Sequence, residues 1–208
     1  MYQKYLKRLG DIVFSFSGIV LLSPVLLLIS IWVKLDSKGP LLFKQTRIGK
    51  GKSKFTIYKF RSMNMDTPKN VPTHKFRLPD KYITRAGKIL RRSSLDELPQ
   101  LWNILKGDMS LIGPRPALWN QVDLVAERDK YGANDIRPGL TGWAQINGRD
   151  ELEIPFKAKL DGEYVKRLSF TFDLRCFFGT IVSVLRHEGV FEGSKQANEV
   201  KNSKEQDD

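Results

Sequence analysis

The segment Ile12-Val-Phe-Ser-Phe-Ser-Gly-Ile-Val-Leu-Leu-Ser-Pro-Val-Leu-Leu-Leu-Ile-Ser-Ile-Trp-Val33 carries no charged side chain, and it decides how the rest of the chain must be arranged. As one straight helix it would be about 33 Å long, enough to cross the hydrocarbon core of a bilayer. A cleavable signal peptide has a shorter apolar region and a small-residue cleavage site, whereas Lys34-Leu-Asp-Ser-Lys38 follows here. The segment therefore predicts a retained membrane anchor.

Two features of this segment bear on whether it spans the bilayer or enters and returns. Positively charged flanks favour the cytoplasmic side, and both flanks are basic: Lys4, Lys7 and Arg8 precede the segment, and Lys34, Lys38 and Lys44 follow it. Near its middle lies Ser23-Pro24, where the proline removes a backbone donor and favours a bend. Each arm would then reach about 17 Å, halfway into the hydrocarbon. A re-entrant and a spanning anchor both remain open on the residues alone.

The composition of the chain limits its partners. Its 208 residues include 35 Lys and Arg against 23 Asp and Glu, a formal net charge of +12. Such a charge requires an anionic partner, which can be nucleic acid, anionic lipid or a phosphorylated substrate. The single cysteine, Cys176, excludes an internal disulfide, and with only His74 and His187 beside it a zinc site is not expected. A metal here would be a hard, oxygen-ligated cation such as Mg²⁺.

Apolar periodicity in the remainder predicts a mixed α/β fold that is mostly helical. We expect a strand at 55–60, helices at about 83–92, 99–106, 118–131, 155–167 and 171–186, and loops at 64–80 and 132–149. The last helix is amphipathic, so packing in the core and lying at the membrane interface both remain open. The polar tail 192–208 is expected to be disordered.

The adjacent acids Asp96 and Glu97 are the main candidates for chemistry. Ser94 lies three residues before Glu97 and matches a capping box, which would give the acid a purely structural role. Pro99 argues against that register, because proline is tolerated at the start of a helix but not at its fifth residue. If the helix starts at Pro99, the pair lies in the turn before it. One carboxylate can then be a nucleophile and the other a base or support for a metal. Site and cap both remain open.

Several cations lie beside rigid turns. In Gly113-Pro-Arg-Pro116 the two prolines restrict the backbone around Arg115, which suits a bidentate phosphate clamp. The alternative is an ion pair between this arginine and a nearby acid. The segment Arg137-Pro-Gly-Leu-Thr-Gly-Trp-Ala-Gln-Ile-Asn-Gly-Arg149 combines glycines, an aromatic ring and terminal arginines, and Lys59 and Arg61 end the predicted strand. Together with the membrane segment and the acidic pair, these cations indicate phosphate chemistry on a membrane-borne substrate.

A set of ordered motifs resembles a known family. They are Phe43-Lys-Gln-Thr-Arg-Ile-Gly49, Tyr58-Lys-Phe-Arg-Ser-Met63, Asp96-Glu-Leu-Pro-Gln-Leu-Trp-Asn-Ile-Leu-Lys-Gly-Asp-Met-Ser110, Gly113-Pro-Arg-Pro116, the 137–149 segment and Asp161-Gly-Glu-Tyr-Val165. From about residue 4 to 187 the chain resembles the bacterial sugar transferases, also called monotopic phosphoglycosyl transferases, in their minimal catalytic form.

The resemblance implies a reaction with a covalent intermediate. Asp96 matches the nucleophile that attacks the sugar-bearing phosphate of a UDP-sugar and releases UMP. Glu97 matches the partner acid that assists polyprenyl (undecaprenyl) phosphate in collecting the phosphosugar. The resemblance also implies Mg²⁺ at the acidic pair, with Asp96 as its ligand, which would offset repulsion between carboxylate and phosphate. The candidate substrate-binding residues are Lys59, Arg61, Arg115, Arg137, Gln145 and Asp173.

The resemblance also implies a membrane topology. Ser23-Pro24 matches the family's break in a re-entrant helix, which favours the re-entrant anchor. We therefore expect a membrane hairpin at 1–36, a catalytic domain with amphipathic interfacial helices at 37–191 and the tail at 192–208. This arrangement would place the protein on the cytoplasmic face of the bacterial cytoplasmic membrane, at an anionic lipid interface.

Two rival functions fit parts of the sequence. A membrane-tethered basic module could bind nucleic acid or lipid through its charge and through Trp102, Trp119 and Trp143. That function leaves the acidic pair and the proline-flanked arginine unexplained, so nucleic acid is not an expected partner. Direct glycosyl transfer without a covalent step would release UDP instead of UMP. No motif specifies the sugar, the pathway or the oligomeric state.

Overall fold

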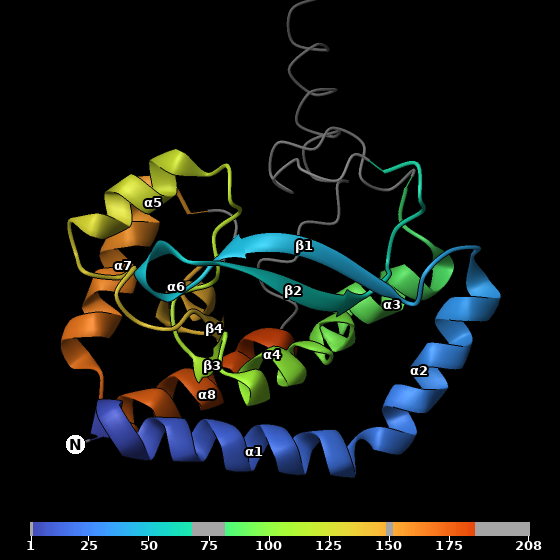
Figure 1. Cartoon of the computed structure of the whole chain (residues 1–208), viewed down its shortest axis with the longest axis horizontal. Coiled ribbons are helices and arrows are strands. Elements are labelled where there is room, and N and C mark those ends of the chain that lie inside the picture. The colour runs from blue at the N-terminus through green and yellow to red at the C-terminus, as the bar shows by residue number, and fades with distance from the viewer. Residues whose placement is uncertain (1, 68–81, 149–151, 186–208) are drawn as a thin grey trace, which may run out of the picture.

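A bent pair of helices forms the N-terminal part of the computed structural model, which describes residues 2–67, 82–148 and 152–185 (Figure 1). A π-helical turn, η1 (Tyr2–Leu6), leads into α1 (Lys7–Leu21), and α2 (Ser23–Asp36) follows. No single helix in these ranges is long and apolar enough to cross a membrane, but α1 and α2 together meet that criterion and are bent by 62°. Most of the predicted loop 64–80 and the whole predicted tail 192–208 lie outside the described residues.

The bend falls where the sequence predicts it. Leu22 departs from helical dihedral angles, with φ −90° and ψ 3°, and Pro24 occupies the first turn of α2. The Ser23 hydroxyl donates to the Val20 carbonyl at 2.8 Å, satisfying one backbone acceptor at the break. The two arms are 15 and 14 residues long. Each is longer than half of the apolar block, because α1 begins before that block, at Lys7, and α2 ends after it, at Asp36.

Two small sheets stand between the helices. The predicted strand is present as β2 (Lys54–Phe60), which pairs antiparallel with β1 (Leu42–Ile48), a strand that the periodicity did not predict. Further along, β3 (Ser110–Ile112) pairs parallel with β4 (Gly139–Thr141). The prediction of a plain loop at 132–149 is therefore wrong, because that segment contains β4 and the short helix α6 (Trp143–Ile146).

The predicted helices are confirmed, with one change. They are α3 (Arg85–Arg92), α4 (Gln100–Lys106), α5 (Val122–Asp129), α7 (Ile154–Arg167) and α8 (Phe170–Leu185). The change is in α5, which starts four residues later than expected. The Leu118 backbone N–H donates to the Gln121 side chain there and holds a turn in place of the first helical turn. The described chain is thus mixed α/β and mostly helical.

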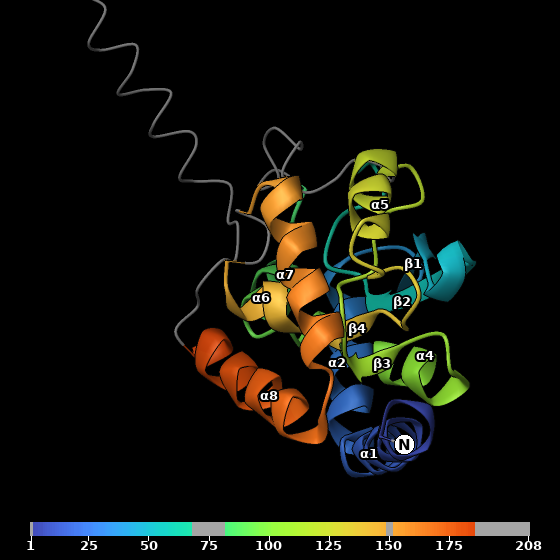
Figure 2. The same ribbon diagram turned by 90° about the vertical axis from the view of Figure 1, so that its left-hand side faces the viewer.

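The bent pair is part of the core of the molecule. From α2, Ile29 and Val33 pack with Phe60 and Leu90, and from α1, Ile19 packs beside Leu101. On another side, α7 and α8 contribute a cluster around Tyr164 and Phe172. Figures 1 and 2 show α1 and α8 along the same side of the molecule, with the two sheets above them.

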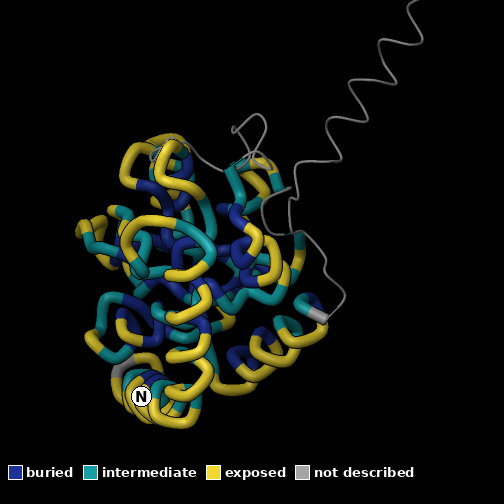
Figure 3. Tube along the Cα trace, turned by 90° about the vertical axis from the view of Figure 1, so that its right-hand side faces the viewer, coloured by how far each residue is buried: buried dark blue, intermediate teal, exposed yellow. Residues whose placement is uncertain are grey.

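Helix α8 packs in the core, as one of its two interpretations predicts, and its position at the membrane interface stays a prediction. Its residues Phe172 and Cys176 are buried, whereas the opposite face exposes Phe170, Leu174, Phe177, Phe178, Ile181 and Val182. Figure 3 shows the same division, with exposed residues along the outer side of α8 and buried residues along its inner side. The helix therefore packs in the core and also presents an apolar surface.

Candidate active site

A tight turn between α3 and α4 presents the acidic pair. Ser94 adopts a left-handed conformation, with φ 57°, and reverses the chain into the 3₁₀ turn η5 (Leu95–Glu97). Pro99 then starts α4 with helical dihedral angles. Since the Ser94 side chain makes no capping hydrogen bond, the capping-box alternative is not present. Leu95 and Leu98, on either side of the pair, pack against the α2 cluster and hold this turn on the bent helix.

Glu97 is held by two cations from distant parts of the chain. Lys59 Nζ, at the end of β2, lies 2.6 Å from Glu97 Oε1. Arg115 donates from Nη2 to the same oxygen at 2.8 Å and from Nη1 to Oε2 at 3.4 Å. Of the two roles left open for Arg115, the ion pair with a nearby acid is present. The fold thus brings four predicted site residues together, with Asp96 as the fourth.

The two carboxylates of the pair have different surroundings. Asp96 is buried, and no side chain or backbone group of the described residues donates a hydrogen bond to its carboxylate. Burial raises the pKa of Asp96, while the charge of Lys59 opposes this rise and that of Glu97 adds to it. Burial also acts to raise the pKa of Glu97, but the charges of Arg115 and Lys59 outweigh it and hold that pKa well below the usual range. Two carboxylates whose surroundings shift their pKa values in opposite directions are suited to two different roles in a reaction.

Three glycines bring the loop that carries Arg115 close to the next sheet strand. A Cβ atom on Gly139 would lie 2.1 Å from the Gly113 nitrogen, and one on Gly142 would lie 2.1 Å from the Gly113 oxygen. Only glycine permits this approach. On the other side, Arg47 of β1 donates to the Pro116 carbonyl at 3.0 Å. This bracing role of Arg47 was not predicted, although the residue belongs to the 43–49 motif.

Three other predicted substrate-binding residues lie elsewhere. Arg61 is buried and donates to the backbone carbonyls of Val33 and Ser37, which joins β2 to the end of α2. Arg137 donates to the Gly107 carbonyl at 2.9 Å, just after α4. Gln145 is buried in α6, and its amide has no hydrogen-bond partner within the described part of the chain. The hydrogen bonds of both arginines thus go to backbone groups and not to the acidic pair.

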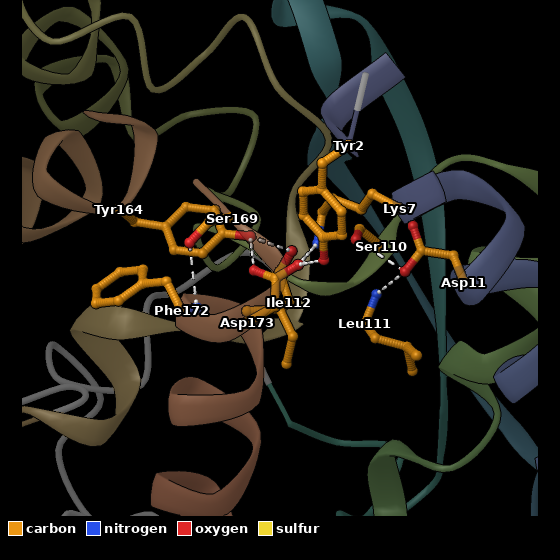
Figure 4. Close-up of polar contacts among 10 residues, drawn as sticks. All are labelled: Tyr2, Lys7, Asp11, Ser110, Leu111, Ile112, Tyr164, Ser169, Phe172 and Asp173. Atoms are coloured by element: carbon orange, nitrogen blue, oxygen red, sulfur yellow. Dashed lines mark hydrogen bonds and ion pairs between the residues drawn. The ribbon is translucent and has the colours of Figure 1, made fainter. Parts of the chain in front are cut away.

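Asp173 joins the start of the chain to its last helices. Its carboxylate accepts hydrogen bonds from the Tyr2 hydroxyl, from Lys7 Nζ at 2.6 Å and from the Tyr164 hydroxyl at 2.6 Å (Figure 4). With three donors from η1, α1 and α7, this carboxylate fastens the N-terminal helix to the catalytic domain predicted from the sequence. Its substrate-binding role stays a prediction.

A second buried acid, Asp11, was missed by the sequence analysis. Its Oδ1 accepts from the Ser110 hydroxyl at 3.0 Å and from the Leu111 backbone N–H at 2.9 Å, so it holds β3 (Figure 4). The sequence held a signal for this role, because Asp11 directly precedes the apolar segment 12–33. Burying a carboxylate there costs free energy unless hydrogen-bond donors are buried with it.

Comparison with known proteins places the chain in a family. The family model described as bacterial sugar transferase matches residues 2–187. An uncharacterized sugar transferase, EpsL, of Bacillus subtilis is 40% identical over 94% of this chain and 93% of its own length. The exopolysaccharide production protein PSS of Rhizobium leguminosarum is 44% identical over 86% of this chain and 95% of its own length.

A larger relative carries a more specific name. The UDP-glucose:undecaprenyl-phosphate glucose-1-phosphate transferase of Escherichia coli is 40% identical over 86% of this chain, which spans 40% of that protein. The family match covers Glu97 and the three predicted site residues gathered around it, Lys59, Asp96 and Arg115. On the extent of these matches, the chain belongs to the bacterial sugar transferase family.

Proposed function

We propose that this protein transfers a sugar 1-phosphate from a UDP-sugar to undecaprenyl phosphate and releases UMP, through a phosphosugar bound covalently to Asp96. The observation that supports it is the buried carboxylate of Asp96, to which none of the described residues donates a hydrogen bond, beside Glu97, whose oxygens hold Lys59 and Arg115. The Escherichia coli relative is named for a transfer of this kind with glucose. Such a reaction is the first membrane step in building a bacterial polysaccharide or glycoconjugate.

In the first step an Asp96 carboxylate oxygen attacks the phosphorus that bears the sugar. A new oxygen–phosphorus bond forms, and the bond from that phosphorus to the oxygen of UMP breaks, so UMP leaves with the electron pair. The cations of Lys59 and Arg115 offset the negative charge of the phosphates during this exchange. Their ion pairs with Glu97 position them before substrate arrives.

In the second step a phosphate oxygen of the polyprenyl carrier attacks the same phosphorus. The bond to Asp96 breaks, its carboxylate is restored, and the product is a diphosphate-linked sugar on the lipid. A phosphate monoester is largely ionised near neutral pH, so its oxygen needs little help from a base. Glu97, whose pKa is lowered, therefore assists the carrier mainly by orienting Lys59 and Arg115.

The acidic pair also suits a magnesium ion. The described residues hold no group of three or more His, Cys, Asp or Glu side chains that could bind a metal by themselves. Mg²⁺ does not require such a group, because it commonly binds one or two carboxylates together with substrate phosphates and water. Asp96, whose carboxylate accepts no hydrogen bond from the described residues, is the residue that would hold it. The ion would supply neutralisation of the phosphate charge.

The bent pair supports the proposal that this chemistry takes place at the membrane. We propose that α1 and α2 enter the bilayer from the cytoplasmic face and return, since both flanks are basic and the two helices are bent by 62° at the break. The outer faces of the pair expose Phe14, Phe16, Leu21, Leu27, Leu28 and Leu35, and α8 adds its own apolar face. The net charge of +12 suits an anionic lipid surface. The turn with Asp96 packs on α2, which would bring it close to a lipid carrier held in the membrane.

Product analysis tests the reaction. The full chain in detergent is incubated with UDP-glucose, UDP-galactose or UDP-N-acetylgalactosamine, with and without undecaprenyl phosphate. We expect UMP in stoichiometric amount without the carrier, and continuous UMP release with it, for the sugar that is used. Release of UDP would indicate direct glycosyl transfer, and no nucleotide release with any UDP-sugar would refute the proposed function.

A further inference from the structure

Asp11 completes the open edge of β3. On one side, β3 pairs with β4: the Ser110 N–H donates to the Pro138 carbonyl just before β4, and the N–H of Gly113, just after β3, donates to the Thr141 carbonyl. The intervening N–H of Leu111 goes instead to Asp11 Oδ1, which also accepts from the Ser110 hydroxyl (Figure 4). A three-residue strand has few hydrogen bonds to define its position, so a buried carboxylate on its free edge constrains it strongly. Arg115 follows four residues after Leu111.

Arg8, three residues before Asp11 on α1, holds the helix that follows Glu97, the other member of the ion pair with Arg115. Arg8 donates to the carbonyls of Ile104 and Leu105, at 2.6 and 2.9 Å, in the last turn of α4. That helix begins directly after the turn that carries Glu97. Residues 8 and 11 are three apart and share one face of α1. One face of the N-terminal helix therefore grips both elements that meet at Glu97 and Arg115.

We propose that Asp11 is a positioning residue for Arg115: by holding β3 against α1, it sets where the guanidinium meets Glu97 and the substrate phosphate. This inference rests on the proposed transfer reaction. The connection is short, because β3 ends one residue before Gly113-Pro-Arg-Pro116, and the close packing of Gly113 against Gly139 and Gly142 leaves the loop little freedom to readjust. A displaced β3 would carry Arg115 with it, and small errors in the position of a phosphate-binding group reduce the rate strongly.

A double-mutant cycle separates positioning from mere stabilisation. UMP release by the detergent-solubilised full chain is measured with the UDP-sugar that the parent uses, for Asp11→Ala, Arg115→Ala and the double variant. We expect Asp11→Ala to lower kcat/KM about tenfold or more in the parent. In the Arg115→Ala background the same change should cost less than about twofold, because Asp11 would act through the missing guanidinium.

Matched variants show which property of Asp11 matters. Asp11→Asn keeps an Oδ1 acceptor for both donors and should retain most of the rate. Ser15→Ala, at another buried position on α1 whose hydroxyl bonds only within its own helix, should leave kcat/KM nearly unchanged. If Asp11→Ala fails to fold, as judged by its thermal unfolding, Ser110→Ala replaces it in the cycle. Ser110→Ala removes one of the two hydrogen-bond donors to Asp11. Its effect on kcat/KM should be smaller than that of Asp11→Ala, and it should also vanish in the Arg115→Ala background.

The outcomes distinguish this inference from the reaction it rests on. Suppose the parent is active, and Asp11→Ala (or Ser110→Ala in its place) lowers kcat/KM by the same factor in the parent and in the Arg115→Ala background. That result would overturn the positioning role alone. Absence of UMP release by the parent would overturn the proposed reaction and the inference with it.

Discussion

Glu97 and Arg115 form an ion pair, with Arg115 Nη2 2.8 Å from Glu97 Oε1, next to the buried carboxylate of Asp96. The pair joins the turn before α4 to the loop after β3. Lys59 completes the arrangement from β2. Negative charge on Glu97 thus holds two cations next to Asp96. In the proposed reaction these cations would bind the phosphate groups and Asp96 would form the covalent bond.

Removing the nucleophilic oxygen should abolish transfer without disturbing the fold. Asp96→Asn keeps the shape of the side chain. In the described structure the Asp96 carboxylate makes no hydrogen bond, so the change removes none that stabilises the fold. We expect UMP release to fall more than about 10³-fold. Expression and recovery in the membrane fraction should match the parent. Substantial turnover with continued UMP release would contradict the assignment of Asp96 as nucleophile.

Arg115 should matter for its geometry as well as its charge. Arg115→Ala should weaken use of the nucleotide sugar by about 10²-fold in kcat/KM, because the clamp loses a bidentate cation. The matched variant Arg115→Lys keeps the charge and should recover only part of this loss. Steady-state UMP release over a range of UDP-sugar concentrations measures both. Wild-type kinetics in Arg115→Ala would mean that the Gly113–Pro116 loop is only a turn.

The acid limb of the pH–rate profile should shift in opposite directions in two variants. Asp96 must be ionised to attack, and its pKa is raised, so kcat/KM should decline with falling pH above the ordinary range of an aspartate. Glu97 raises the pKa of Asp96 and Lys59 lowers it. Glu97→Gln should therefore move the acid limb to lower pH, and Lys59→Met should move it to higher pH. A limb that stays in place in both variants would assign the titration to another group.

A buried ion pair away from the site should govern stability. Arg128 of α5 and Asp161 of α7 meet at 2.6 Å with side chains 4% and 1% exposed. Arg128→Met should cost about 3–5 kcal/mol, because it strands a buried carboxylate, and Arg128→Met with Asp161→Leu should recover much of that. Lys52→Met, at the exposed pair with Asp129, serves as control and should change little. Thermal unfolding measures all three. A larger loss in the double variant than in Arg128→Met would contradict this account.

The break between α1 and α2 should determine on which side of the membrane the chain begins. Ser23→Ala with Pro24→Leu restores a continuous apolar helix of about 33 Å, long enough to span and to carry the N-terminus across. The probe is Gln3→Cys, with Cys176 replaced, and a thiol reagent that cannot pass the membrane. In spheroplasts the parent should stay unlabelled, and the Ser23/Pro24 variant should gain label. Ser30→Ala, a serine change away from the break, should behave as the parent. Strong labelling of the parent would mean a spanning anchor.

The local features of this protein follow from its sequence. Pro24 places the bend and Pro99 places the start of α4, because a missing backbone donor acts on its own turn of the chain whatever packs around it. Apolar periodicity was enough for β2 and for the helices α3, α4, α5, α7 and α8, but not for the short helix α6. It failed for β1, β3 and β4, since short strands depend on a partner strand more than on their own residues.

The partners of each charge were decided only by the tertiary structure. Nothing in the spacing of Lys59, Glu97 and Arg115 states that they meet, and nothing distinguishes Arg61, which ends buried against α2, from Lys59 two residues before it. The same holds for Asp11, which lies about 100 positions from the strand that it holds. Residue types and local turns are encoded by neighbours along the chain, whereas the pairing and the pKa of a buried charge depend on which distant groups the packed core brings beside it.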